Sequence, residues 1–314
     1  MVVVFFGTPE FAVPSLDALI ASRHRVAAVV SQPDRPRGRG QQLQATPTRA
    51  LAEAHGIPVL QPVRIRDEAF LERIRALAPD LGVVVAYGRI LPDALIAIPR
   101  LGMINVHASI LPRYRGAAPI QRAVMAGDPE TGVTIMRIAS ELDAGATFAV
   151  QSVPIPPNAT SGDIESTLAS VGAGLLLPVV DALDAGRASE TPQDPAKATF
   201  APKITKEEGP IDWAQPAATI HHRIRGLQPW PLASTTLGGR RLVLRRSGVR
   251  SPSPPGGPRR PGTVIRARGD ELVVACGDGT ALQVLEIQPE GKRTMAVRDF
   301  IAGRGVAEGD QFGT

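Results

Sequence analysis

Residues 102–112 read Gly102-Met103-Ile104-Asn105-Val106-His107-Ala108-Ser109-Ile110-Leu111-Pro112. The apolar run at the start, residues 101–104, predicts a strand buried on both faces, which is typical of a parallel sheet. Because side chains alternate along an extended segment, Asn105, His107 and Ser109 are expected on one face near the strand's carboxyl end. Open α/β sheets bind ligands at that edge, so this stretch predicts both a fold and the place of a site.

A carboxylate follows about thirty residues after this stretch, in the turn Glu141-Leu142-Asp143-Ala144-Gly145. A bend there can aim Asp143 back at His107. The set Asn105, His107 and Asp143 suits acyl transfer to an amine, because an Asn amide and a protonated imidazole can stabilise the oxyanion that forms. The carboxylate can fix the imidazole tautomer and accept a proton from the attacking ammonium. The same pattern also fits a core histidine and a turn aspartate, and the pattern alone leaves both interpretations open.

The first half of the chain alternates strand and helix signals. Apolar runs at 2–6, 26–30 and 81–86 predict strands, and Thr46-Pro47 is a good cap and first-turn pair for a helix. This alternation predicts an α/β fold with a doubly wound, mostly parallel sheet. A long amphipathic helix is expected over 161–185, and it would close this first domain.

The second half has a different pattern. Residues 188–216 are rich in Pro, Lys, Glu and Thr, which is typical of a linker. One helix near 217–225 and five short strands then predict a small β-barrel, and the Pro/Gly-rich segment 251–258 is expected to be a disordered excursion from it. We therefore expect a catalytic domain over 1–189, a linker over 190–208 and a second domain over 209–314.

Composition narrows the class of protein. A chain of 314 residues is long enough for two domains with separate cores. The single cysteine, Cys276, and the lack of a Cys/His cluster at metal-ligand spacing predict a reducing cytoplasm and no metal. We expect no membrane association, because there is no signal peptide and no apolar run approaches membrane-spanning length. Nothing in the sequence demands more than a monomer.

Positive charge is concentrated in two places, and the net charge is +5. The loop 32–40 carries Arg35, Arg37 and Arg39 among two prolines and two glycines, which we expect to exclude regular structure. A second cluster, Arg240, Arg241, Arg245 and Arg246, lies on or near one predicted strand pair. Each is either a solvated surface or a contact for phosphate groups, and the sequence does not separate these interpretations.

The motifs together resemble one family. Asn105-x-His107-x-Ser109-Ile110-Leu111-Pro112, followed by Asp143-x-Gly145, is similar to the signature of the folate-dependent formyltransferases. The likeness covers essentially the whole chain. It implies a Rossmann-like catalytic domain and a C-terminal OB-like β-barrel. It also implies transfer of a formyl group from 10-formyltetrahydrofolate, as co-substrate, to the α-amine of initiator methionyl-tRNA in translation initiation.

The resemblance also implies roles for individual residues. Asn105, His107 and Asp143 match the catalytic trio. Folate contacts are expected from the loop residues Ser109, Ile110, Leu111 and Pro112 and from the turn at Tyr87 and Gly88. The alternative for Tyr87 is that it only caps the core, which is the commoner role of a tyrosine at a strand end. Contacts with tRNA are expected from Arg35, Arg37, Arg39, Lys206, Arg245 and Arg246.

Two rival functions stay open. The same trio serves family members that formylate glycinamide ribonucleotide or an amino sugar, or that hydrolyse the formyl-folate. The basic loop and the second domain argue against these, because a small substrate would not require them. The other rival is a non-catalytic RNA-binding protein, for which the barrel and the arginines would be the functional part.

Overall fold

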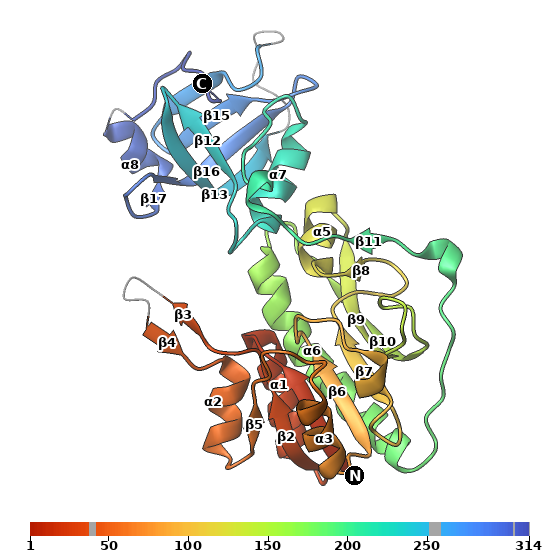
Figure 1. The fold of residues 1–314 in the computed structure, drawn as a ribbon. Coiled ribbons are helices and arrows are strands. Elements are labelled where there is room, and N and C mark those ends of the chain that lie inside the picture. Colours follow the sequence, from red (N-terminus) through yellow and green to blue (C-terminus); the bar gives the residue numbers. More distant parts are fainter. Residues whose placement is uncertain (38–41, 251–258, 304, 314) are drawn as a thin grey trace. The chain divides into compact units, whose positions relative to one another are not determined.

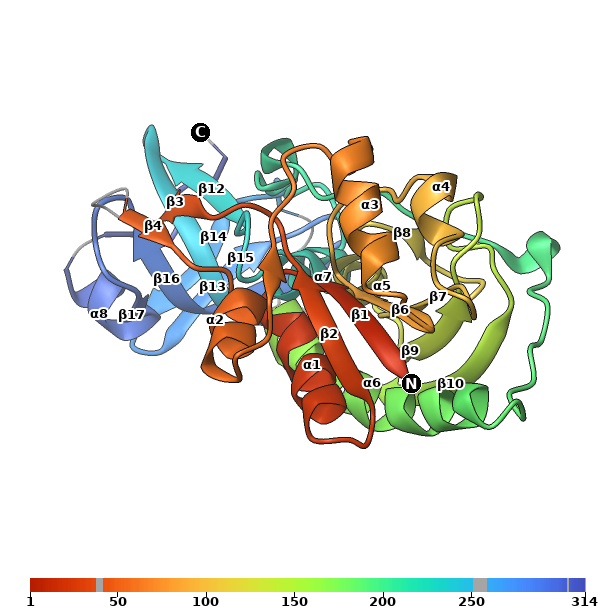
Figure 2. The same cartoon turned by 60° about the horizontal axis from the view of Figure 1, so that its bottom comes forward.

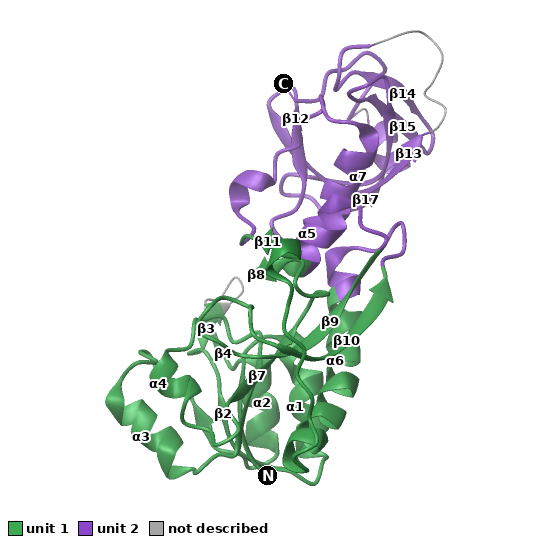
Figure 3. Ribbon diagram, turned by 90° about the vertical axis from the view of Figure 1, so that its right-hand side faces the viewer, with its two compact units in different colours: residues 1–119, 130–154, 165–202 green, residues 120–129, 155–164, 203–314 purple. Residues whose placement is uncertain are grey.

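The computed structural model describes residues 1–37, 42–250, 259–303 and 305–313. The chain folds into two compact units, coloured in Figure 3. Unit 1 comprises residues 1–119, 130–154 and 165–202, and unit 2 comprises residues 120–129, 155–164 and 203–314. The continuous domain ranges expected above stay predictions. The predicted disordered excursion at 251–258 lies outside the described residues.

Unit 1 is built on a seven-stranded sheet. Its order is β10 (Thr147–Pro154), β9 (Glu130–Arg137), β7 (Met103–His107), β6 (Leu81–Val85), β1 (Val2–Gly7), β2 (Arg25–Val30) and β5 (Val59–Leu60). Only β9 runs antiparallel to its neighbours within this sheet. The predicted mostly parallel sheet is therefore confirmed. Because the chain continues from β1 to β2 on one side and later to β6 on the other, the strand order reverses beside β1.

Helices cover both faces of this sheet. In Figures 1 and 2, α1 (Val13–Ile20) and α6 (Ser161–Asp184) lie on one face, and α3 (Glu68–Ala76) and α4 (Asp93–Ile96) lie on the other. The helix α2 (Pro47–Ala54) begins at the predicted cap, where the hydroxyl of Thr46 accepts a hydrogen bond from the backbone N–H of Arg49. Apolar side chains of β1, β2, β6, α3 and α4 form one buried cluster. This packing fixes the carboxyl ends of the parallel strands at one edge.

The helix α6 corrects one expectation. By length and composition it could cross a membrane, although we expected no apolar run of that size. Core helices of soluble proteins share this length and composition. Here Leu168, Leu176 and Val180 are fully buried within the protein. At Gly172 a Cβ atom would lie 2.8 Å from a methyl group of Val106, so the helix backbone packs closely on β7.

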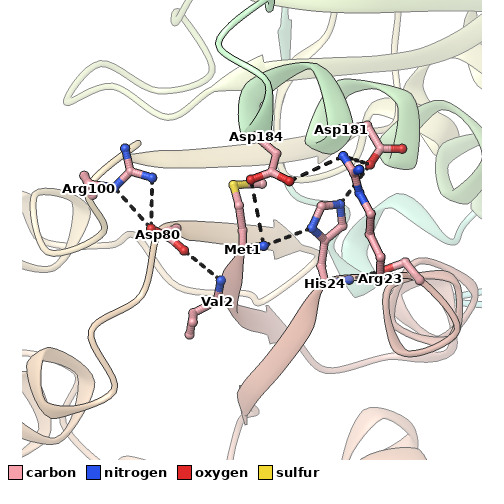
Figure 4. Close-up of polar contacts among 9 residues, drawn as sticks. Met1, Val2, Arg23, His24, Asp80, Arg100, Asp181 and Asp184 are labelled. Carbon is pink, nitrogen blue, oxygen red and sulfur yellow. Dashed lines mark hydrogen bonds and ion pairs between the residues drawn. The ribbon is translucent and has the colours of Figure 1, made fainter.

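The amino-terminal edge of the sheet is tied together by charged groups, shown in Figure 4. The Asp80 carboxylate accepts hydrogen bonds from the Val2 backbone (2.8 Å) and from Arg100 (2.9 Å). These two donors lower the pKa of Asp80. His24, directly before β2, has its Nε2 3.1 Å from a carboxylate oxygen of Asp181 near the end of α6. The contacts thus hold the starts of three strands and the end of α6.

The basic loop contains regular structure, so the expectation that prolines and glycines would exclude it is wrong. Residues Arg35–Arg37 (β3) pair antiparallel with Gln42–Gln44 (β4). Both strands of a two-stranded ribbon are edge strands, and the outward N–H groups of an edge strand face solvent. Pro36, which has no N–H, is therefore tolerated. Asp34, directly before β3, fixes the start of this strand pair, since its carboxylate accepts hydrogen bonds from Arg49 and from Gln61.

Unit 2 contains an antiparallel sheet. Its order is β12 (Ser234–Leu237), β13 (Arg240–Arg250), β16 (Ala281–Pro289), β15 (Glu271–Ala275) and β14 (Val264–Arg268), with β17 (Met295–Ala296) paired to β16. Residues 309–313 bond to both edges of this sheet. Gly313 donates to the Thr236 carbonyl at one edge, and Val264 at the other donates to the Asp310 carbonyl. The sheet is closed in this way, as the predicted barrel requires. Among the described residues, the α-helices of unit 2 are α5 (Pro119–Ala126, whose first residue belongs to unit 1), α7 (Ala217–Gly226) and α8 (Val297–Ala302), together with the first turn of α6 at 161–164.

The segment expected to be a linker has short elements of its own. It contains the 3-10 helices η2 (Pro195–Lys197) and η3 (Lys206–Glu208) and the two-residue strand β11 (Phe200–Ala201). The strand β11 pairs in parallel with β8 (Arg115–Gly116). Residues 165–202 belong to unit 1, so the first part of this segment belongs to the unit that contains β7.

Candidate active site

Two of the predicted catalytic side chains lie on β7. Val106 faces α6, and so the alternation of the strand places Asn105 and His107 on the opposite face. The His107 side chain is 6% exposed, and its Nε2 lies 3.0 Å from the Tyr114 carbonyl oxygen. Asn105 is half-buried, and its amide makes no hydrogen bond within the described part of the chain. It is therefore available to a substrate.

Asp143 reaches this face from the loop between β9 and β10. Its carboxylate Oδ2 lies 3.7 Å from Nδ1 of His107 and accepts a hydrogen bond of 2.8 Å from the backbone N–H of Gly116. Asp143 has a φ of 49°, in the left-handed region that Asp adopts more readily than most residues. Two residues on, a Cβ atom at Gly145 would lie 1.9 Å from the Arg137 carbonyl oxygen. The loop thus needs glycine at 145 to return over the sheet.

The arrangement constrains the imidazole chemically. Both ring nitrogens of His107 face oxygen acceptors, one a carbonyl and the other a carboxylate. A hydrogen bond from Nε2–H to Tyr114 leaves Nδ1 on the side of Asp143. The separation of 3.7 Å is longer than a direct hydrogen bond, so a water molecule or a substrate group can share this space. The site can therefore place an ammonium or an oxyanion between Asn105, His107 and Asp143.

The predicted folate loop follows β7 directly. Ser109 lies beyond the strand, and its buried hydroxyl donates to the Arg113 carbonyl (2.7 Å) within the loop. The loop is held by Thr134 of β9, whose hydroxyl donates to the Ser109 carbonyl (2.7 Å) and accepts from the backbone of Leu111 (3.1 Å). Leu111 is buried, whereas Ile110 and Pro112 are partly exposed. Those two positions are the ones open to a ligand.

Tyr87 and Gly88 follow β6 at the same edge of the sheet. The Tyr87 ring packs edge-on against Phe6 at 5.7 Å and is buried in the core. Burial raises the pKa of its phenol. Gly88 is exposed, with a φ of 86°. A ligand at this turn would therefore meet backbone groups, while the tyrosine ring acts as a core residue.

Sequence reasoning missed three residues that support the site, namely Thr134, Arg115 and Gln193. Gln193 donates to the carbonyls of Asp143 and Gly145 and accepts from Arg115. Arg115 belongs to the run that follows the central stretch, but its part in the site depends on contacts distant in sequence. Gln193 lies in the predicted linker, where no local pattern marks it.

The predicted RNA-contacting residues are distributed over both units. Arg35 is exposed in unit 1, whereas the Arg37 side chain and the whole of Arg39 lie outside the described part of the chain. Lys206 is exposed in unit 2. Arg245 is half-buried, and Arg246 forms an exposed ion pair of 3.1 Å with Glu286.

Comparison with known proteins places this site in a family. The "Formyl transferase" model matches residues 1–180, and the model of the "Formyl transferase, C-terminal domain" matches residues 203–305. The chain is 49% identical to a methionyl-tRNA formyltransferase of Moorella thermoacetica, covering 100% of this chain and 99% of that protein. A second methionyl-tRNA formyltransferase, of Methylococcus capsulatus, is 48% identical, with 100% of both chains covered.

Solved structures share the fold at low identity. HypX from Aquifex aeolicus in complex with tetrahydrofolic acid has a TM-score of 0.65 and 18% identity, covering 98% of this chain and 48% of that one. An N-formyltransferase from Helicobacter canadensis, in complex with folinic acid and dTDP-3-aminofucose, has a TM-score of 0.68 and 17% identity, covering 92% of this chain and 100% of that one. With both family models matched and relatives similar along their whole length, the chain belongs to the formyl transferase family.

Proposed function

We propose that this chain transfers the formyl group of 10-formyltetrahydrofolate to the α-amino group of methionine on initiator tRNA, giving N-formylmethionyl-tRNA. The observation that carries the chemistry is the meeting of His107 and Asp143, at 3.7 Å, beside the Asn105 amide, which makes no hydrogen bond among the described residues. Identity of 49% with a methionyl-tRNA formyltransferase over nearly its whole length supports the choice of acceptor. An enzyme of translation initiation would work in the cytoplasm.

In the proposed reaction, the amine nitrogen attacks the formyl carbon, a C–N bond forms and the carbonyl oxygen becomes an oxyanion. The Asn105 amide and the protonated His107 ring stabilise that oxygen. Asp143 orients His107 and accepts the proton that the amine nitrogen loses, directly or through water. The bond from the formyl carbon to N10 of the folate then breaks, and N10 leaves with that proton. No covalent enzyme intermediate is required.

The folate is proposed to lie along the loop of Ile110 and Pro112 and the turn at Gly88. These positions are exposed or partly exposed at the carboxyl ends of β7 and β6, next to the place where the strand order reverses. A crevice at such a point is where open α/β sheets bind ligands. Backbone groups there would hold the pterin ring.

For the tRNA, we propose phosphate contacts by Arg35, Arg37 and Arg39 on the basic loop and by Lys206, Arg245 and Arg246 in unit 2. Exposed ion pairs such as Arg246–Glu286 contribute only about 0–1 kcal/mol, so Arg246 can exchange Glu286 for a phosphate at little cost. The contacts with the RNA backbone should make binding strongly dependent on salt.

The test is a transfer assay with isotopically labelled 10-formyltetrahydrofolate. Initiator methionyl-tRNA, glycinamide ribonucleotide and an amino-sugar nucleotide are offered in parallel, and the products are identified by mass. Label on the methionine amine alone is the expected result. Label on a small acceptor alone would refute the tRNA assignment, and intact folate with salt-dependent RNA binding would favour a binding protein. His107→Ala serves as the inactive control.

A further inference from the structure

We propose that Gln193 is a positioning residue for the transfer reaction, which holds the Asp143 carboxylate in place through the carbonyl of Asp143 itself and that of Gly145, two residues further on. This inference rests on the proposed function of Asp143. Gln193 itself lies in the segment after α6 and belongs to unit 1, together with Asp143.

The contacts of Gln193 use every hydrogen-bonding group of its amide. Nε2 donates to the carbonyl oxygens of Asp143 (2.8 Å) and Gly145 (2.7 Å). Oε1 accepts from Nε (3.2 Å) and Nη2 (2.9 Å) of Arg115. An amide has two N–H donors and one oxygen with two lone pairs, so the side chain is fully satisfied. Its orientation is thereby fixed, with nitrogen toward the loop and oxygen toward the guanidinium.

The position of the Arg115 side chain is itself constrained. Its side chain is only 4% exposed, and it makes a further contact of 3.2 Å to Glu141, two residues before Asp143 in the same loop. Its backbone is held by the pairing of β8 with β11. A buried guanidinium is costly without acceptors, and so Arg115 anchors Gln193 and, through Glu141, a second point of the loop.

The turn that carries Asp143 is exposed on its outer side, and besides Gln193 and Arg115 the loop is anchored by Ser140, whose hydroxyl donates to Asp93 (3.0 Å). Leu142, next to Asp143, is half-exposed, and Glu141 is exposed. Asp143 is in a left-handed conformation, which the surrounding contacts must maintain. Its carboxylate has the Gly116 N–H as one anchor, and the carbonyls of Asp143 and Gly145, both bonded to Gln193, restrain the backbone that follows it. Without them, the carboxylate is expected to move away from His107.

The test uses the full-length chain and the substitution Gln193→Glu. The replacement has nearly the same shape and keeps an acceptor for Arg115, but it turns a carboxylate oxygen toward two carbonyl oxygens. We expect kcat to fall by about 100-fold, the loss that a misplacement of about 1 Å can cause, with the KM for folate nearly unchanged. If Gln193→Glu does not fold, as judged by thermal unfolding, Gln193→Asn keeps the neutral amide but shortens its reach.

The matched control is Gln311→Glu in unit 2. Gln311 also donates to two carbonyls, those of Pro261 (2.8 Å) and Phe312 (3.1 Å), and it accepts from the Thr263 hydroxyl. The substitution should therefore destabilise unit 2 without lowering kcat. An equal loss of kcat in both variants would mean that Gln193 acts only on stability, which would overturn the proposal.

A double-mutant cycle with Asp143→Asn separates positioning from a general structural role. If Gln193 acts through the Asp143 carboxylate, Gln193→Glu should cause little further loss in the Asp143→Asn background. The inference would be overturned if the loss of kcat in the double variant equalled the product of the losses in the two single variants. A Gln193→Glu variant with wild-type kcat would overturn it as well. Failure of the proposed function looks different, because the wild type would then not formylate methionyl-tRNA. The cycle would be measured on the acceptor that the wild type does use.

Discussion

Thr134→Val tests whether one buried hydroxyl holds the loop after β7. The hydroxyl of Thr134 is fully buried and bonds both to the Ser109 carbonyl and to the Leu111 N–H. A valine side chain has nearly the same shape as threonine, but it has no hydroxyl and makes neither hydrogen bond. Each lost hydrogen bond costs about 1 kcal/mol, and the unpaired buried backbone groups raise the total to about 3 kcal/mol. For a unit of this size, that corresponds to a decrease in Tm of about 6–12 °C.

The assay is calorimetric unfolding of the wild type and two variants. The control, Thr131→Val, lies on the same strand, and the Thr131 hydroxyl is buried without a hydrogen-bond partner among the described residues. It should therefore be neutral or slightly stabilising. We also expect Thr134→Val to raise the KM for folate, because the loop of Ile110 and Pro112 is released. Equal Tm values for the two variants would refute this account of the loop.

Further outcomes follow from the site and from unit 2. Asn105→Ala and His107→Ala should each lower kcat at least about 100-fold while the Tm stays near that of the wild type, since each removes a proposed oxyanion donor; near-normal turnover would exclude that role. Gly145→Ala places a Cβ atom 1.9 Å from the Arg137 carbonyl, so both Tm and kcat should fall, and an unchanged Tm would show that the loop is pliable there. Burial lowers the pKa of His221, so the unfolded chain binds a proton that the folded chain does not. The stability of unit 2 should therefore fall as the pH drops below about 6.5, and His221→Gln should weaken this dependence in unfolding measured at several pH values.

Local spacing was enough to place some of these residues. The period of two along an extended segment put Asn105 and His107 on one face, and the structure has them on β7 opposite Val106. The glycine-containing turn likewise indicated that Asp143 can return to His107, and the two side chains do meet. Patterns of this kind succeed because the geometry depends on neighbours in sequence.

Features that depend on contacts between residues distant in sequence could not be predicted from local spacing. Gln193 bonds to peptide carbonyls, which every residue type has, so no pairing of residue types marks it. The Tyr87 side chain could have faced a ligand or the core, and only packing against Phe6 decides this. In the basic loop, the local signal of Pro36 was overridden, because this residue lies in β3, and distant contacts of Asp34 with Arg49 and Gln61 fix the chain just before that strand.

The closure of the unit 2 sheet has a consequence for how the chain is made. Residues 309–313 join the two edges of the sheet, and they follow in sequence every strand that they connect. During synthesis on a ribosome, β12 and β14 would emerge well before the segment that covers their edges. Uncovered strand edges pair readily with other chains. A nascent or prematurely ended chain would therefore be prone to aggregation through the edges of this sheet, and chaperones that bind exposed strands would act there.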